Sequence, residues 1–351
     1  MHMADALLAP AVAATMYVAS GAAAGVSIHK LRKDSEPQKL PIMAVTSALV
    51  FAGQMINYTI PGTGSSGHMC GGMLLSALLG PFAGFLSMIV ILAIQCLFFA
   101  DGGLMALGAN VWNMAFYGCF VGYFLIWRPI MRGRLFGEGK GSQRLRIIAA
   151  SVIGCVVSLQ LGAFSVVLET SLSGITELPF GAFCALMQPI HLAIGLIEGV
   201  VTAAVLVFVH EARPELLRDA RALGGSAPKR SLKSVVIILA VVAVVVGGGL
   251  SLLASSNPDG LEWALFGNVE KGYSENMGLD EESFGVSSSV ADTAGSIQES
   301  TSFLPDYSFA DNETPAGTTV SGIVGSAMVA AVALLICLAG GFFRRKKRKA
   351  E

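Results

Sequence analysis

Long apolar runs constrain this chain most, because seven of them are each about as long as a lipid bilayer is thick. A helix of about 20 residues crosses a hydrocarbon core of about 30 Å. Only 13% of the residues are charged, compared with roughly 25% in soluble domains. The sequence therefore predicts an all-α integral membrane protein. The expected spans are 6–28, 41–60, 104–127, 147–169, 186–209, 233–254 and 321–343.

A further apolar stretch, 69–99, could form one helix or two. As a single helix it would be about 46 Å long, which exceeds the bilayer. Gly80-Pro81 can interrupt it, giving a short helix at 69–79 and a full one at 82–99. The split also places every Lys/Arg cluster on one side, which the positive-inside rule identifies as cytoplasmic. These clusters lie at 30–39, 128–146, 213–233 and 344–349.

The expected architecture is a helical bundle of about seven transmembrane helices, one of them short, followed by two C-terminal transmembrane helices that flank an acidic external loop. The protein is expected in the cell membrane as a multi-pass protein. Its N-terminus is expected outside and its C-terminus in the cytoplasm.

The start of the chain, Met1-His2, carries several nitrogen donors. The free amine of Met1, the amide nitrogen of His2 and the His2 imidazole can chelate one ion in a plane, which suits Ni(II) or Cu(II), with Co(II) close in affinity. A glycine-rich loop at 61–72 is expected on the same external side, and its His68 can supply a fourth nitrogen. The alternative is a chance Met-His start and an ordinary solvated histidine in an external turn.

Several short motifs are distributed along residues 1–210. They are Met1-His2-Met3, Gly62-Thr63, Gly67-His68, Gly71-Gly72, Gly80-Pro81, Asp101-Gly-Gly-Leu104, Leu107-Gly-Ala-Asn110 and His191-x-x-Ile-Gly-x-x-Glu198. With these motifs the sequence resembles the substrate-binding membrane component of nickel/cobalt energy-coupling factor transporters. The resemblance implies a planar four-nitrogen site made by the Met1 amine, the His2 amide and imidazole, and His68. It also implies Ni(II) or Co(II) as transported substrate, with a cytoplasmic ATPase pair and a coupling transmembrane subunit as partners.

Four other polar residues are candidates for supporting roles. Asp101, at the external end of the span 82–99, can orient a metal ligand or cap the next helix. Asn110 is expected to join helices. His191 and Glu198 are seven residues apart and therefore share a helix face. Ionisable residues at such positions usually mark function, so the two can support the metal site or pair with each other.

The C-terminal third has a different character. We expect residues 1–211 to form the metal-binding component, 212–231 a cytoplasmic linker, and 232–351 a two-helix module with a cytoplasmic basic tail at 344–351. The module's external loop, 255–320, holds twelve acidic residues and one lysine, which favours a solvated tether with little packed core.

The loop begins with Asn257-Pro-Asp-Gly-Leu-Glu262, which can open a short capped helix. This segment resembles the signature of the small two-helix partner subunit of the same transporters, fused here to the main chain. The resemblance implies that the segment docks against the mouth of the metal site.

The sequence thus predicts the substrate-capture component of an ATP-driven uptake system for a divalent transition metal, Ni(II) before Co(II). The chain has no GxxxxGK[ST] phosphate-binding loop, so we expect ATP hydrolysis in a separate subunit and no enzyme activity here. Neither an organic cofactor nor a nucleic-acid partner is expected. The alternative is an ion-coupled secondary carrier that works without an ATPase and relays protons through His191, Glu198 and Asp101. A membrane metalloenzyme has little support, because the sequence has no HExxH motif.

Overall fold

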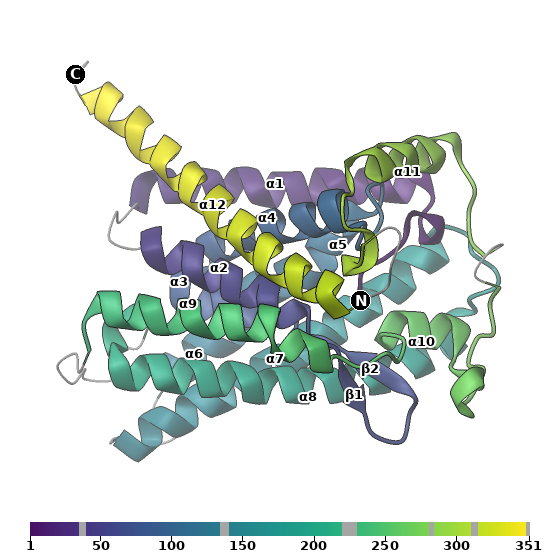
Figure 1. The fold of residues 1–351 in the computed structure, drawn as a ribbon, viewed down its shortest axis with the longest axis horizontal. Coiled ribbons are helices and arrows are strands. Elements are labelled where there is room, and N and C mark those ends of the chain that lie inside the picture. Colours follow the sequence, from purple (N-terminus) through teal and green to yellow (C-terminus); the bar gives the residue numbers. More distant parts are fainter. Residues whose placement is uncertain (35–39, 134–139, 220–229, 281–283, 310–314, 349–351) are drawn as a thin grey trace.

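The computed structural model of the chain is almost entirely helical, and most of its long helices run roughly along one axis (Figure 1). It describes residues 1–34, 40–133, 140–219, 230–280, 284–309 and 315–348. Within these ranges, seven helices are long and apolar enough to cross a membrane, which confirms the expected fold class. The longer elements are α1 (Pro10–Asp34), α2 (Leu40–Gln54), α4 (Pro81–Phe99), the π-helix η3 (Val111–Trp127), α7 (Lys140–Leu172), α8 (Phe180–Ala212), α9 (Leu232–Gly248) and α12 (Pro315–Arg348).

Shorter elements connect these helices. They are η1 (Asp5–Leu7), β1 (Tyr58–Ile60), β2 (Ser65–Gly67), α3 (Gly72–Leu79), α5 (Leu107–Asn110), α6 (Arg128–Arg132), η4 (Pro214–Leu216), η6 (Leu250–Leu253), α10 (Gly260–Phe266), η7 (Val269–Lys271), α11 (Ser289–Thr301) and η8 (Pro305–Tyr307).

The stretch 69–99 is divided into two helices, as the sequence predicts. Gly80 separates α3 from α4 with a φ of 90°, a backbone conformation that residues with a Cβ rarely adopt. Pro81 follows as the first residue of α4, where its missing N–H leaves no hydrogen bond unmade. The short helix begins at Gly72, three residues later than expected.

The span expected at 41–60 is correct to Gln54 and wrong for its last six residues. The helix α2 ends at Gln54, and the chain then forms the antiparallel hairpin β1–β2, in which Tyr58 pairs with Gly67. Gly62 and Gly64 make the turn with φ of 79° and 75°. The hairpin returns the chain to the bundle, so that His68 directly follows β2.

The described residues of the acidic segment 255–320 are folded over the end of the bundle that holds the N-terminus (Figure 1). The helix α10 has a complete capping box between Asp259 and Glu262. In α11, Gln298 donates a hydrogen bond to the carbonyl of Gly102 at 2.7 Å. The expectation of a solvated tether is therefore wrong for the described part of this segment, because caps and hydrogen bonds to neighbouring loops order it. Residues 220–229 of the expected linker and 349–351 of the tail lie outside the described residues.

The helices α7 and α8 pack closely along two glycines of α8. A Cβ on Gly195 would lie 3.0 Å from the Cα of Val156, and one on Gly199 would lie 2.6 Å from the Cα of Val152. Small residues four apart let helix backbones approach in a membrane. This contact fixes the helix that carries His191 and Glu198.

We expect Gly199→Ala to lower the stability of the protein by about 1–3 kcal/mol, because the added methyl group overpacks the α7–α8 contact. The measurement is thermal unfolding in detergent. Gly181→Ala is the matched control, since nothing lies within 4 Å of a Cβ at that position of α8. Equal melting temperatures for the two variants would contradict this description of the contact.

Candidate metal centre

The first three residues are inserted into the protein. Met1 is 4% exposed and Met3 is fully buried. Asn110 holds Met3 by two hydrogen bonds: its Oδ1 accepts from the Met3 amide at 2.7 Å, and its Nδ2 donates to the Met3 carbonyl at 3.1 Å. The amide of Gly103 donates to the same carbonyl at 2.9 Å. Asn110 therefore fixes the extended N-terminal segment. It does not join two helices, as was expected.

His68 faces the Met1 amine. Its Nδ1 lies 3.1 Å from the Met69 carbonyl, which requires the proton on Nδ1 and leaves the Nε2 lone pair free. That Nε2 lies 3.4 Å from the Met1 nitrogen. Burial, and then the Met1 ammonium, lower the pKa of His68 to about 4, so the ring is neutral at neutral pH. The His2 ring stacks on it, with 5.2 Å between centroids and 18° between planes.

Asp101 orients His2. The Nδ1 of His2 lies 3.0 Å from Oδ1 of Asp101, and the Tyr307 hydroxyl donates to Oδ2 at 2.5 Å. Burial raises the pKa of Asp101, but His2 and the Tyr307 hydrogen bond outweigh it and lower the pKa to about 2. The helix-capping role considered for Asp101 falls instead to Asp5, which accepts a hydrogen bond from the Ala106 amide at 2.9 Å.

Asp259 completes the centre, and sequence reasoning did not assign it there. Its Oδ1 caps α10, accepting from Leu261 and Glu262 at 2.8 and 2.9 Å. Its Oδ2 binds the Met1 amine at 2.5 Å and lies 3.8 Å from Nε2 of His68. Burial lowers the pKa of the Met1 amine, but Asp259 more than compensates, so that pKa is raised. The feature of the sequence that could have indicated this role is the capping box. A capping aspartate uses one carboxylate oxygen for the helix and leaves the other available for a second partner.

The segment around Asp259 also covers the glycine-rich loop. The Ser66 amide donates to the Pro258 carbonyl at 2.7 Å, and the Trp263 indole donates to the Thr63 carbonyl at 2.9 Å. The C-terminal segment therefore forms one wall of the centre, between the loop and the inserted N-terminus.

His191 and Glu198 lie on one face of α8 but do not pair with each other. The Nδ1 of His191 bonds to the Met187 carbonyl at 2.8 Å, and its buried Nε2 has no hydrogen-bond partner among the described residues. Glu198 instead accepts hydrogen bonds from the amides of Cys70 and Gly71, at 2.8 and 2.9 Å. Glu198 thereby holds the chain two residues beyond His68.

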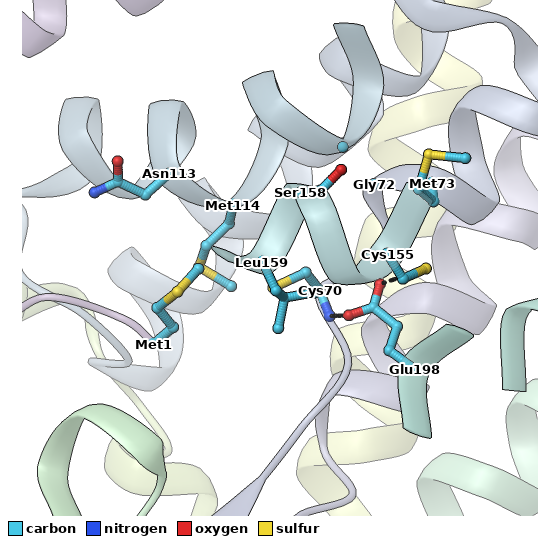
Figure 2. Close-up of a pocket in the computed structure, with 11 residues that line it drawn as sticks. Met1, Cys70, Gly72, Met73, Asn113, Met114, Cys155, Ser158, Leu159 and Glu198 are labelled. Carbon is cyan, nitrogen blue, oxygen red and sulfur yellow. Dashed lines mark hydrogen bonds between the residues drawn. The ribbon is translucent and has the colours of Figure 1, made fainter. Parts of the chain in front are cut away.

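Two small cavities adjoin the centre, each with room for a water-sized particle. The outer cavity is lined by Met1, Gly67, His68, Cys70, Leu159, His191, Ile194, Asp259 and Gly260. The inner cavity, whose lining side chains Figure 2 shows, includes Met1, Cys70, Met73, Asn113, Met114, Cys155, Ser158, Leu159 and Glu198. In the described part of the chain, no three His, Cys, Asp or Glu side chains are arranged to hold a metal. A nitrogen site here therefore needs the amine and amide of the chain start.

Comparison with known proteins agrees with this geometry. Residues 2–216 match the family described as the cobalt uptake substrate-specific transmembrane region. The chain belongs to that family. Residues 233–340 match a second family, the PDGLE domain. The protein is therefore a multi-pass membrane component of a transport system and not an enzyme, and the resemblance noted in the sequence is confirmed.

Several relatives of this family member carry related names. A protein of Archaeoglobus fulgidus, provisionally named fused nickel transport protein NikMN, is 33% identical over 95% of this chain and 96% of its own length. The cobalt transport protein CbiM of Sorangium cellulosum is 31% identical over 62% of this chain and 94% of its own length. The crystal structure of a truncated transition metal transporter is similar with a TM-score of 0.52 and 32% identity, covering 60% of this chain and 99% of that one.

We expect Asn110→Ala to release the inserted N-terminus, because two hydrogen bonds to Met3 are lost and its amide is left buried without a partner. The Met1 amine should then react faster with an amine-acylating reagent, measured by mass spectrometry of the N-terminal peptide. Thr15→Ala is the control, since Thr15 is exposed on α1 and bonds only within that helix. Unchanged protection in Asn110→Ala would contradict this role.

Proposed function

We propose that this protein captures a divalent transition-metal ion, Ni(II) or Co(II), at a planar nitrogen site on the external face of the membrane. The observation that carries the proposal is the buried approach of the Met1 amine to Nε2 of His68, 3.4 Å apart. The amine and the His2 amide nitrogen close one chelate ring, and the amide and Nδ1 of His2 close a second. His68 supplies the fourth nitrogen.

The His2 ring turns when the ion binds. In the structure its Nδ1 faces Asp101, while its buried Nε2 has no partner among the described residues. A half-turn of the ring about its bond to Cβ exchanges Nδ1 with Cδ2 and Nε2 with Cε1, so that Nδ1 leaves Asp101 and can bind the metal. We assign to Asp101 the role of orienting the metal-bound histidine, as carboxylate partners of such rings do.

The relatives named for nickel and for cobalt, together with the donor set, support Ni(II) as the preferred ion and Co(II) as the second. Four nitrogens in a plane suit Ni(II), and nickel follows cobalt in the order of increasing affinity. We assign residues 1–211 to metal capture and 232–351 to a covering module. The supporting roles belong to Asn110, which fixes the chain start, and to His191 and Glu198 on α8.

Asp259 neutralises the charge of the Met1 ammonium group. Its carboxylate stabilises the protonated Met1 amine, and it faces the position where the dication would lie. Metal ligands must be deprotonated, so binding releases both the amine proton and the proton of the His2 amide. The metal ion then replaces the ammonium group as the positive charge beside the Asp259 carboxylate.

Transport by this component needs energy from outside the chain, which has no phosphate-binding loop. We propose a cytoplasmic ATPase pair and a coupling transmembrane subunit as partners, with the metal centre facing outward before reorientation. The alternative secondary carrier needs a proton relay through Asp101, His191 and Glu198. Among the hydrogen bonds recorded for the described residues, none joins these three.

We expect acetylation of the Met1 amine, or His68→Ala, to abolish tight binding of Ni(II), because each removes a nitrogen donor. Equilibrium dialysis of purified protein with a native N-terminus measures the affinity. The control is His29→Ala, whose histidine is exposed near the end of α1. Tight binding that survives acetylation would refute the proposed site.

The Met1 amine predicts a pH dependence. Asp259 raises the pKa of this amine, so below that pKa the ion displaces the amine proton as well as the His2 amide proton, and apparent affinity falls about a hundredfold per pH unit, compared with about tenfold above that pKa. We expect Asp259→Asn, which preserves the α10 cap, to lower the pKa and move the onset of Ni(II) binding to lower pH. Asp292→Asn, in exposed acidic sequence of the same module, is the control. Weaker binding of Asp259→Asn at every pH would instead make Asp259 a ligand.

A further inference from the structure

The inner cavity lies next to the outer one. It shares Met1, Cys70 and Leu159 with the outer cavity. The helix α8 places His191 in the outer cavity and Glu198, two turns later, in the inner one, a step of about 10 Å along the helix. That step runs towards the end of α8 that precedes the basic segment 213–233, the side expected to be cytoplasmic.

Glu198 gives this cavity the character of a cation site. It is 1% exposed, and the three donors recorded for it are all uncharged: the amides of Cys70 and Gly71 and the thiol of Cys155. Hydrogen bonds orient a buried carboxylate but do not neutralise its charge. An intramembrane carboxylate of this kind is typical of an ion pathway.

Several sulfur-containing side chains line the same space. The Cys155 thiol lies 3.8 Å from Oε1 of Glu198 (Figure 2). Met73 and Met114 also line the cavity. Gly122 leaves room for the Met73 side chain, since a Cβ there would lie 2.5 Å from its sulfur.

We propose that the inner cavity is a transit site at which a divalent transition-metal ion, after leaving the nitrogen centre, binds the Glu198 carboxylate and the Cys155 sulfur. This inference rests on the proposed function. Metal–sulfur and metal–oxygen bonds of about 2.3 and 2.1 Å span separations of up to about 4.4 Å, and the observed 3.8 Å falls within that reach. The amides of Cys70 and Gly71 remain on the carboxylate and orient it, as the partners of metal-bound carboxylates do.

Charge balances at this site. The ion binds the thiolate of Cys155, whose proton is released to solvent, and one thiolate with one carboxylate neutralises a dication. Two protein anions, with thioethers as the neighbouring donors, hold an ion less firmly than the four-nitrogen chelate. A transit site needs this weakness, because an ion must leave it as well as enter it.

Glu198 also connects the two sites. Its carboxylate holds the backbone at Cys70 and Gly71, two and three residues after His68. An ion in the inner cavity therefore binds Glu198, the same residue that fixes the loop after His68. Ion binding in the inner cavity and the position of the His68 loop are thereby coupled through the Glu198 carboxylate.

Co(II) absorption tests the transit site, because a thiolate ligand gives a sulfur-to-cobalt charge-transfer band in the near ultraviolet. We expect purified His68→Ala, whose nitrogen centre is disabled, to develop this band with Co(II). The band should be lost in His68→Ala/Cys155→Ser and kept in His68→Ala/Cys119→Ser. Cys119 is the matched control, since it is buried but bonds to the Gly72 carbonyl and does not line the cavity. No band, or a band that survives Cys155→Ser, overturns the inference.

A second measurement keeps the test decisive if His68→Ala does not fold. In vesicles with the complete transporter, Cys155→Ser should bind the first equivalent of Ni(II) as the native protein does but take it up about tenfold more slowly. Cys119→Ser should match the native protein in both. Equal uptake by the two variants overturns the transit site alone, whereas a native protein that fails to bind the first equivalent overturns the proposed function.

Discussion

The structure depends on burying a charged chain start. Met1 is almost inaccessible, and its amine lies between the Asp259 carboxylate and the neutral His68 ring. A buried ammonium is costly unless it is paired, so the carboxylate from far along the chain is a condition for the N-terminus to enter the bundle. Once there, the amine lies beside Nε2 of His68, and the His2 ring stacks on the His68 ring.

This condition also explains why the C-terminal module folds onto the bundle. Asp259 uses one oxygen to begin α10 and the other to bind Met1. The same short stretch covers the hairpin turn through Ser66 and Trp263. The module and the metal centre are therefore parts of one structure, and the acidic residues of the segment do not prevent it from packing.

The sequence predicted the features that arise from local physics. Apolar length gave the helical bundle, and Gly80-Pro81 gave the break between α3 and α4. The end of α2 at Gln54 was missed, because apolar residues continue after it and only the turn glycines indicate a hairpin. The segment 255–320 was expected to be solvated because it contains many acidic residues. Composition does not reveal that other side chains of the segment form hydrogen bonds to backbone carbonyls of the bundle.

Side-chain placement at the centre was only partly predictable. The metal donors could be proposed because Met1, His2 and His68 follow a recognisable motif. Asp259 could not, since nearly 200 residues separate it from His68 and its visible role is to cap a helix. The direction of the His2 ring towards Asp101 is likewise a property of tertiary packing.

X-ray absorption spectroscopy of the nickel-loaded protein, prepared with its native N-terminus, tests the central claim most directly. The account predicts four nitrogen neighbours in a planar, four-coordinate environment, with neither sulfur nor carboxylate oxygen in the first shell. A six-coordinate ion with oxygen neighbours would contradict it, because the ion would then be held by carboxylates or water and not by the inserted chain start.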